Sequence, residues 1–380
     1  MTQSWEKTLL AFEYIEDDAS LTALVSQYRQ SDLLVLDTEF VRTRTFYARL
    51  GLIQAYDGKT LALIDPVAVN NLSEFWGLLA EPGITTVLHS CSEDLEVFAR
   101  NGHCQPANLF DSQIAAALCG LGHGLGYAKL VEQTLDISLD KGESRTDWMK
   151  RPLSEAQLNY AANDVYYLYN LYPQLLEKLQ QQGRLAWVIE EGERMTRGRL
   201  TPPDLDQAYL KVKNAFQLSP RQLAYLKVLA RWRLKKAITR DLAVGFVVKD
   251  HALIGLAKKQ PKNSQDLFKM IELTEQEKRI HGKDLLVLLK TADVENPPKA
   301  IDVIALKTGY KTSFKAIKNC LVSISEQQEV PIELLGSKRY IHGYLQWLWD
   351  GKIGESPLLL TGWRKDLVET ALTELKLSNI

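Results

Sequence analysis

The sequence feature that most constrains the fold is a short apolar run that ends in two carboxylates. Residues 33–37 read LLVLD, the pattern of a buried strand, and Thr38 and Glu39 follow directly. Because side chains alternate along a strand, Asp37 and Glu39 point to the same face. Buried carboxylates are costly unless a positive group satisfies them. Many strands also end in acidic turn residues, so this triplet alone does not define a site.

Two later segments supply further acids. An apolar strand pattern at 85–89 is followed by Asp94, on a helix that Ser92 is placed to cap. Tyr160 and Asp164 are four residues apart and share one face of a predicted helix. Carboxylates without neighbouring Cys or His ligands suit hard cations such as Mg²⁺ or Mn²⁺. Two such ions roughly 3.5–4 Å apart can clamp a phosphodiester, but the spacing alone does not show that these acids meet.

The first half of the chain alternates strand-like and helix-like segments. Strand patterns lie at 33–37, 50–56, 61–65, 85–89 and 108–110, with a turn signal at Asp57-Gly58. Helical patterns lie at 71–80, 93–100, 112–119, 126–135 and 154–179. The last of these begins with a Ser154 cap. This alternation predicts an α/β domain with a mixed β-sheet.

The second half reads as helical, and the whole chain is too long for one ordinary core. Pro202-Pro203 and Pro297-Pro298 interrupt the pattern. We therefore predict three domains, with boundaries at 1–200, 207–292 and 298–380. The last two are expected to be small and all-α.

Five segments resemble, in order, the motifs of the ribonuclease D family, the DEDDy branch of the DnaQ-like 3′→5′ exonucleases. They read LVLDTEFVRTRTFYARLGLIQ, HSCSEDLEVF, LFDSQIAAAL, LDKGESRTDWMKRPLS and YAANDVYYL, and the match covers residues 30–175. The resemblance implies a ribonuclease H-like fold for the first domain. The helical half resembles HRDC domains, more clearly over 209–290 than over 300–377.

The resemblance assigns roles to five residues. Asp37, Glu39, Asp94 and Asp164 would hold two divalent cations, Mg²⁺ or Mn²⁺, and Tyr160 completes the catalytic set. A phenol with a pKa near 10 is a poor base at neutral pH, so Tyr160 is expected to orient a metal-bound water. The family also implies hydrolysis of RNA from its 3′ end to nucleoside 5′-monophosphates, with 3′-extended tRNA precursors as substrates.

Other residues in the matched segments are candidates for RNA contact, with ordinary surface packing as the alternative. In the first domain they are Arg42, Arg44, Lys141, Ser144, Arg145 and Trp148. In the helical half they are Arg231, Arg233, Lys235 and Lys236, which share a helix with Arg240, and Lys311, Lys315 and Lys318, which share a helix face. Asp111 is expected either beside the metal ligands or as a helix cap, and His89 and His123 are expected to be structural.

The charge distribution fits a nucleic-acid enzyme. Residues 201–380 hold 29 Lys and Arg against 20 Asp and Glu, whereas residues 1–200 hold 17 against 27. This asymmetry indicates either a half suited to a polyanion or a chance distribution of surface charge, and the charge balance alone does not separate the two. No apolar run approaches the ~20 residues of a membrane span, and the start MTQSWEKTLL lacks a signal-peptide pattern. The four cysteines contain no CxxC pair. We expect a cytoplasmic monomer without zinc or disulfides.

Two alternatives remain open on the sequence. A proofreading-type DNA exonuclease would use the same acids, and only the 2′-hydroxyl of RNA distinguishes the substrates. A catalytically idle RNA-binding protein is the second alternative. Loss of one of the five site positions would have favoured it, and all five are present.

Overall fold

In the computed structural model, which describes residues 10–139, 142–375 and 377, a mixed six-stranded sheet organises the first half of the chain. Its strand order is β1-β4-β3-β2-β5-β6. The strands are β1 (Glu13–Ile15), β2 (Leu33–Val41), β3 (Arg49–Tyr56), β4 (Leu61–Ile64), β5 (Thr85–Leu88) and β6 (Asn108–Asp111). Strand β2 lies in the interior, antiparallel to β3 and parallel to β5. The predicted α/β fold with a mixed sheet is confirmed.

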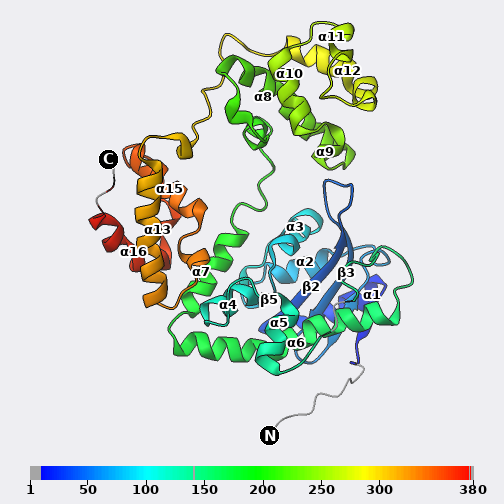
Figure 1. Ribbon diagram of the computed structural model, residues 1–380. Coiled ribbons are helices and arrows are strands. Elements are labelled where there is room, and N and C mark those ends of the chain that lie inside the picture. Colours follow the sequence, from blue (N-terminus) through cyan, green and yellow to red (C-terminus); the bar gives the residue numbers. More distant parts are fainter. Residues whose placement is uncertain (1–9, 140–141, 376, 378–380) are drawn as a thin grey trace. The chain divides into compact units, whose positions relative to one another are not determined.

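Helices pack against this sheet, and the longest, α6, crosses β2, β3, β4 and β5 (Figure 1). They are α1 (Asp18–Tyr28), α2 (Ser73–Leu79), α3 (Ser92–Asn101), α4 (Ser112–Leu118), α5 (Tyr127–Leu135), α6 (Glu155–Gln181) and α7 (Leu185–Thr196). Helix α6 begins at the predicted Ser154 cap, whose hydroxyl accepts from the Gln157 N–H. Val35 of β2 is buried in the same core as Val165 of α6. Because of strand alternation, that face of β2 also carries Asp37 and Glu39.

Sequence analysis did not predict β1, α1 or α7. Strand β1 has only three residues, too few to show an alternation. Helix α1 does bury residues at helical spacing, namely Leu21, Leu24, Val25 and Tyr28. The helical spacing of these apolar residues would have predicted α1 from the sequence.

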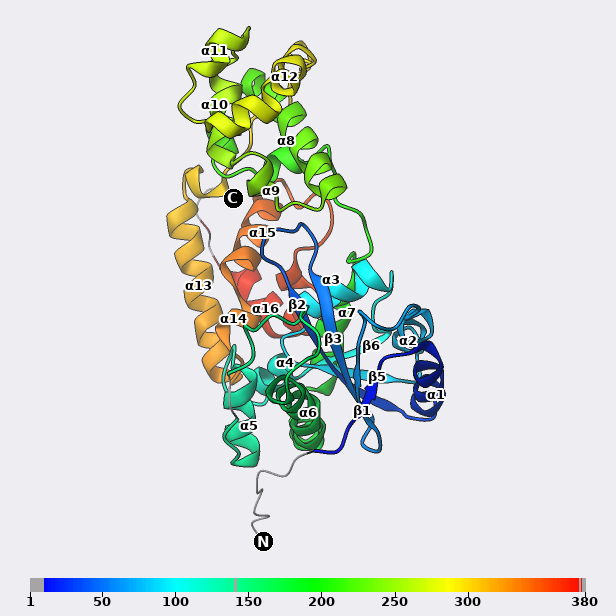
Figure 2. The same cartoon turned by 90° about the vertical axis from the view of Figure 1, so that its right-hand side faces the viewer.

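The carboxy-terminal helices belong to the same compact unit as the sheet. This unit holds the described residues up to Val41, Arg49–Leu200 and those from Ile304 onward. The helices are α13 (Tyr310–Gln327), α14 (Ile332–Leu335), α15 (Lys338–Trp349) and α16 (Gly362–Glu374), with 3₁₀ turns η3 (Ile304–Leu306) and η4 (Leu358–Leu360). Figures 1 and 2 both show α16 beside α7.

Buried polar and aromatic contacts join α7 to α16. The rings of Trp187 and Trp363 stack with centroids 4.8 Å apart. The Glu191 carboxylate, 0% exposed, accepts from the Arg364 guanidinium, 2% exposed. It also accepts from the Trp363 Nε1–H at 3.1 Å and from Arg194 at 2.7 Å. An ion pair this deeply buried holds α16 in one position, because moving α16 away would leave the Arg364 guanidinium in the core without its carboxylate partner.

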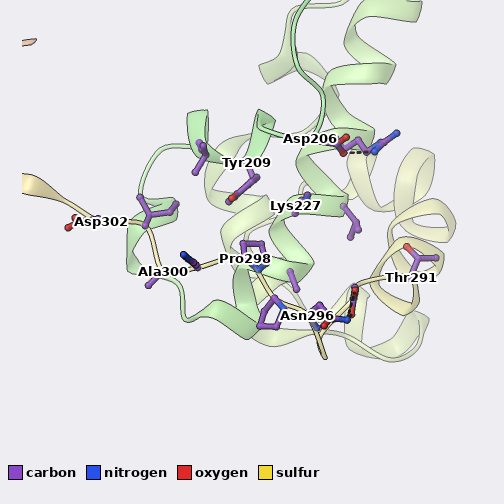
Figure 3. A pocket seen from close by; sticks show the side chains of 16 residues that line it. Asp206, Tyr209, Lys227, Thr291, Asn296, Pro298, Ala300 and Asp302 are labelled. Carbon is purple, nitrogen blue, oxygen red and sulfur yellow. Dashed lines mark hydrogen bonds and ion pairs between the residues drawn. The ribbon is translucent and has the colours of Figure 1, made fainter. Parts of the chain in front are cut away.

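The second compact unit consists of Arg42–Ala48 and Thr201–Val303. It contains η1 (Ala208–Lys211), η2 (Ala215–Gln217), α8 (Pro220–Arg240), α9 (Val244–Val247), α10 (Asp250–Lys259), α11 (Ser264–Phe268) and α12 (Glu275–Lys290). The segment after α12 folds back along α8 and η1 and, with them, lines an open pocket of about 720 Å³ (Figure 3). The sequence boundaries 1–200, 207–292 and 298–380 describe modules along the chain and remain a prediction.

None of the helices formed by the described residues combines the length and apolar character that crossing a membrane requires.

Candidate active site

Three carboxylates converge where α6 packs against the second half of β2. Asp37 and Glu39 come from β2 and Asp164 from α6, and one oxygen of each lies within 4.8 Å of the others. A bulge in the β2–β3 pairing follows Glu39. Bulges increase local twist and re-aim neighbouring side chains. The fold therefore brings together residues that are more than 120 positions apart in the sequence.

Asp94, at the start of α3, lies beside this cluster. Its carboxylate is 6% exposed and accepts a hydrogen bond from the Thr38 hydroxyl. Thr38 stands between Asp37 and Glu39, so β2 carries two of the clustered acids and the hydroxyl that holds Asp94. The charge of Asp94 raises the pKa of both Asp37 and Glu39. Asp94 itself is not one of the three carboxylates within 4.8 Å of each other, and its role as a metal ligand stays a prediction.

The carboxyl groups have strongly raised pKa values. Burial, followed by the charges of Asp164 and Asp94, raises the pKa of Glu39 to about 9. Burial raises the pKa of Asp164 to about 8 and that of Asp94 to about 6. The pKa of Asp37 is also well above its ordinary value, because of burial and the three neighbouring acids.

This donor set fits a divalent cation. The neighbouring charges that raise the pKa of Asp37 are those of Asp94, Asp164 and Glu39, all of them carboxylates in the described part of the chain. Carboxylate oxygens are the ligands that Mg²⁺, Ca²⁺ and Mn²⁺ prefer. A dication would replace the protons that the raised pKa values otherwise retain.

Tyr160 lies one helical turn before Asp164 and donates its hydroxyl hydrogen bond to that carboxylate. Burial and the charges of Asp164, Glu39 and Asp37 raise the pKa of Tyr160 far above its usual value of 10. The phenol therefore stays protonated at neutral pH and can donate or orient, but cannot act as a base. Its role in orienting a metal-bound water stays a prediction.

Sequence analysis missed two residues beside the acids. The Tyr127 hydroxyl, from α5, donates to the carbonyl oxygens of Asn163 at 3.1 Å and Asp164 at 2.5 Å, which fixes the turn that carries Asp164. Gln54 pairs with Asp37 across β2 and β3 and is 0% exposed. Its amide oxygen and nitrogen are both buried without a hydrogen-bond partner among the described atoms. A polar residue within the apolar run LGLIQAY was the available signal.

Asp111 and His89 make hydrogen bonds that hold the backbone near the site. Asp111 caps α4 by accepting from the backbone N–H groups of Gln113 and Ile114. Its second oxygen accepts from the Cys91 N–H at 2.9 Å, at the start of the helix that carries Asp94. His89 bonds to Ser112 Oγ and to the Leu125 carbonyl, as expected for a structural histidine. His123 is exposed.

Two of the candidate RNA contacts are wrong. Trp148 is 1% exposed and packed in the core, so its ring has no face for a base. Arg233 is 7% exposed and bonds to the Asp250 carboxylate and the Val248 carbonyl, so it is structural. Lys141 lies outside the described residues.

The other candidates lie at the surface or partly buried. Lys236 is partly buried and pairs with Asp284 at 3.1 Å, and Arg231 pairs with Asp206 beside the pocket in Figure 3. The remaining candidates are exposed: Arg42, Arg44, Ser144, Arg145, Lys235, Lys311, Lys315 and Lys318.

The fold and the acidic cluster define a 3′–5′ exonuclease domain followed by HRDC domains. A family model described as a 3′-5′ exonuclease matches residues 12–180, an HRDC domain model matches 222–289, and a model of the ribonuclease D C-terminal HRDC domain matches 308–372. The first of these domains implies dependence on a divalent metal.

Relatives in bacteria match almost the whole chain. Ribonuclease D of Shewanella sp. (strain ANA-3) is 67% identical over 98% of this chain and 96% of its own. Ribonuclease D of Escherichia coli (strain K12) is 41% identical over 96% of this chain and 98% of its own. The crystal structure of Escherichia coli RNase D superposes with a TM-score of 0.91, covering 96% of this chain and 98% of the other. The chain belongs to the ribonuclease D family and is an exoribonuclease.

Proposed function

We propose that this enzyme shortens RNA from the 3′ end by two-metal-ion hydrolysis, releasing nucleoside 5′-monophosphates. The observation that carries the proposal is the convergence of Asp37, Glu39 and Asp164 within 4.8 Å, with Asp94 alongside. Two bound divalent cations, Mg²⁺ or Mn²⁺, would polarise the scissile phosphate and lower the pKa of the attacking water. The four carboxylates would hold them, and burial would keep bulk water from screening the charges.

Tyr160 is proposed to position the attacking water. Its hydroxyl is anchored to Asp164 and remains protonated, so its oxygen offers a fixed acceptor next to the carboxylates. A water that is oriented before attack loses less entropy on reaching the transition state. The residue thus contributes through orientation rather than by removing a proton.

The proposed substrates are tRNA precursors with 3′ extensions, processed by a cytoplasmic monomer. The Escherichia coli relative is described as an exoribonuclease involved in structured RNA processing, which supports a structured substrate. The positive balance of residues 201–380, with 29 basic residues against 20 acidic ones, supports contact with a folded polyanion.

The test is digestion of a 3′-extended tRNA labelled at its 5′ end, with Mg²⁺ or Mn²⁺. Wild type should shorten the labelled RNA stepwise, and EDTA, Asp37→Asn and Asp164→Asn should each abolish shortening. Glu177→Gln provides the matched control, because Glu177 is an exposed acid on the same helix as Asp164. An untouched label, or site variants as active as the control, would overturn the proposal. Faster digestion of a DNA strand of the same sequence would favour the DNA exonuclease instead.

A further inference from the structure

An exposed apolar segment follows α8 in the second compact unit. Leu242 is 38% exposed, Val244 37% and Phe246 59%. Phe246 lies on the short helix α9, outside the buried core that α8 and α10 form. Burial of an exposed aromatic ring by a ligand would be favourable, because it removes apolar surface from water.

The loop 42–48 is hydrogen-bonded to the start of this segment, within the same unit. Asp241 ends α8 in the left-handed conformation, and its carboxylate accepts from the backbone N–H groups of Phe46 at 3.1 Å and Tyr47 at 3.0 Å. The Ala243 N–H donates to the Arg44 carbonyl at 2.8 Å. These three hydrogen bonds fix the backbone of loop 42–48 against the residues that follow α8.

The result is a guanidinium beside an exposed ring. The Arg44 guanidinium carbon lies 6.0 Å from the centre of the Phe246 ring, at the outer limit of a cation–π contact. Arg44 is itself exposed. We call this pair the Arg44–Phe246 platform.

The chemistry of the platform suits a nucleobase with its phosphate. Flat aromatic and guanidinium groups stack on bases of any sequence, and the positive charge attracts the adjoining phosphate. The surrounding unit, residues 42–48 and 201–303, holds 21 Lys and Arg against 12 Asp and Glu. As the binding partner of this unit, a polyanion is therefore favoured over a protein whose surface is apolar or has few acidic residues.

The covalent chain links the platform to the catalytic strand. Arg44 follows Glu39 by five residues. Five extended residues span at most about 18 Å, so the Cα atoms of Glu39 and Arg44 stay within that distance whatever the orientation of the two units. A strand whose 3′ end occupies the acidic site would therefore bring bases only a few nucleotides upstream into reach of Arg44.

We propose that the Arg44–Phe246 platform binds an unpaired base of the RNA a few nucleotides upstream of the 3′ end. This site rests on the proposed function, since it presupposes an RNA strand in the active site. It would anchor the single-stranded 3′ extension while terminal nucleotides are removed.

The test measures binding of a fluorescein-labelled single-stranded RNA by full-length protein that carries Asp37→Asn, so that the RNA is not consumed. Phe246→Ala should weaken binding roughly 5- to 150-fold, the range for losing one base–aromatic stack. Phe246→Leu keeps an apolar side chain but should weaken binding similarly, and Phe246→Trp should retain it. Phe268→Ala is the control, because Phe268 is 53% exposed in the same unit.

Equal binding by the Phe246→Ala and Phe268→Ala proteins would overturn the platform, as would full binding by Phe246→Leu. The failure of the proposed function is separable, because it would appear as wild-type protein that does not shorten RNA at all. Circular dichroism of each variant checks folding, and retained binding by Phe246→Trp shows that the position tolerates replacement.

Discussion

Replacing Asp164 by asparagine should stabilise the metal-free protein at alkaline pH while it abolishes activity. One carboxylate oxygen of Asp164 lies within 4.8 Å of carboxylate oxygens of Asp37 and Glu39. Burial is the main cause of the raised pKa of Asp164, so the ionised carboxylate costs desolvation free energy in the metal-free protein, and each unit of pKa corresponds to about 1.4 kcal/mol. Asparagine keeps the size and the acceptor oxygen for Tyr160 but carries no charge. The buried amide of asparagine offsets part of the gain. We expect a gain of about 1–3 kcal/mol at pH 8 in EDTA.

The sign follows from the raised pKa. Asp164 has a pKa of about 8 in the folded protein, against an ordinary value of 3.8. The folded state therefore holds this proton more tightly than the unfolded state, and wild-type stability falls as pH rises from about 4 to 8. The Asp164→Asn protein lacks that loss, so its advantage should be small at pH 5 and largest at pH 8.

The assay is thermal unfolding of wild type, Asp164→Asn and the Glu177→Gln control at pH 5 and pH 8, in EDTA and in Mg²⁺. Each kcal/mol corresponds to roughly 2–4 °C for a domain of 150–250 residues. Mg²⁺ should raise the unfolding temperature of wild type more than that of Asp164→Asn, because only wild type has the full ligand set. A variant that unfolds no later than wild type at pH 8 in EDTA would refute the reasoning.

Three further predictions concern the contact between α7 and α16, the residue opposite Asp37 and the role of Tyr160. Arg364→Met leaves the buried Glu191 carboxylate with Arg194 and Trp363 as its remaining partners. It should lower the free energy of unfolding by about 1–3 kcal/mol, measured by urea denaturation; an unchanged midpoint would contradict the importance of the pair. Gln54→Met removes a buried amide that has no hydrogen-bond partner among the described residues. It should stabilise the metal-free protein by about 1 kcal/mol and raise the Mg²⁺ concentration needed for half-maximal activity. A loss of stability in EDTA would show that the amide is hydrogen-bonded. Tyr160→Phe removes the hydroxyl that orients the water, so it should lower kcat by about 10²-fold and leave RNA affinity unchanged in binding assays. A defect in binding alone would place Tyr160 outside the chemical step.

Local features of the fold could be predicted because they depend on neighbouring residues. The run LLVLD defined the start of β2, and the Ser154 cap placed the start of α6. The family resemblance supplied the combination of the acids, and the structure supplied their convergence. No periodicity links β2 to α6, since that contact depends on how a helix packs on a sheet.

The errors have the same origin. Trp148 and Arg233 lie among charged residues in the sequence, which suggested a surface position, but tertiary packing buries both. The pair of Glu191 and Arg364 spans 173 positions. Nothing local in either segment indicates that they meet, and so the grouping of the carboxy-terminal helices with the sheet was not predicted.

The acidic cluster is stable only because the rest of the domain holds it in place. Each carboxylate is fixed by an element that is itself anchored: β2 by strands on both sides, and the turn of Asp164 by the Tyr127 hydroxyl. Burial of the acids, and their mutual repulsion once they are ionised, opposes folding, and the buried core around α6 offsets this cost. A chain selected for stability alone would replace one of these acids by a neutral residue. Their joint presence is therefore best explained by the positive charge that they are arranged to receive, and the pH dependence of the Asp164→Asn protein measures how much stability that arrangement costs.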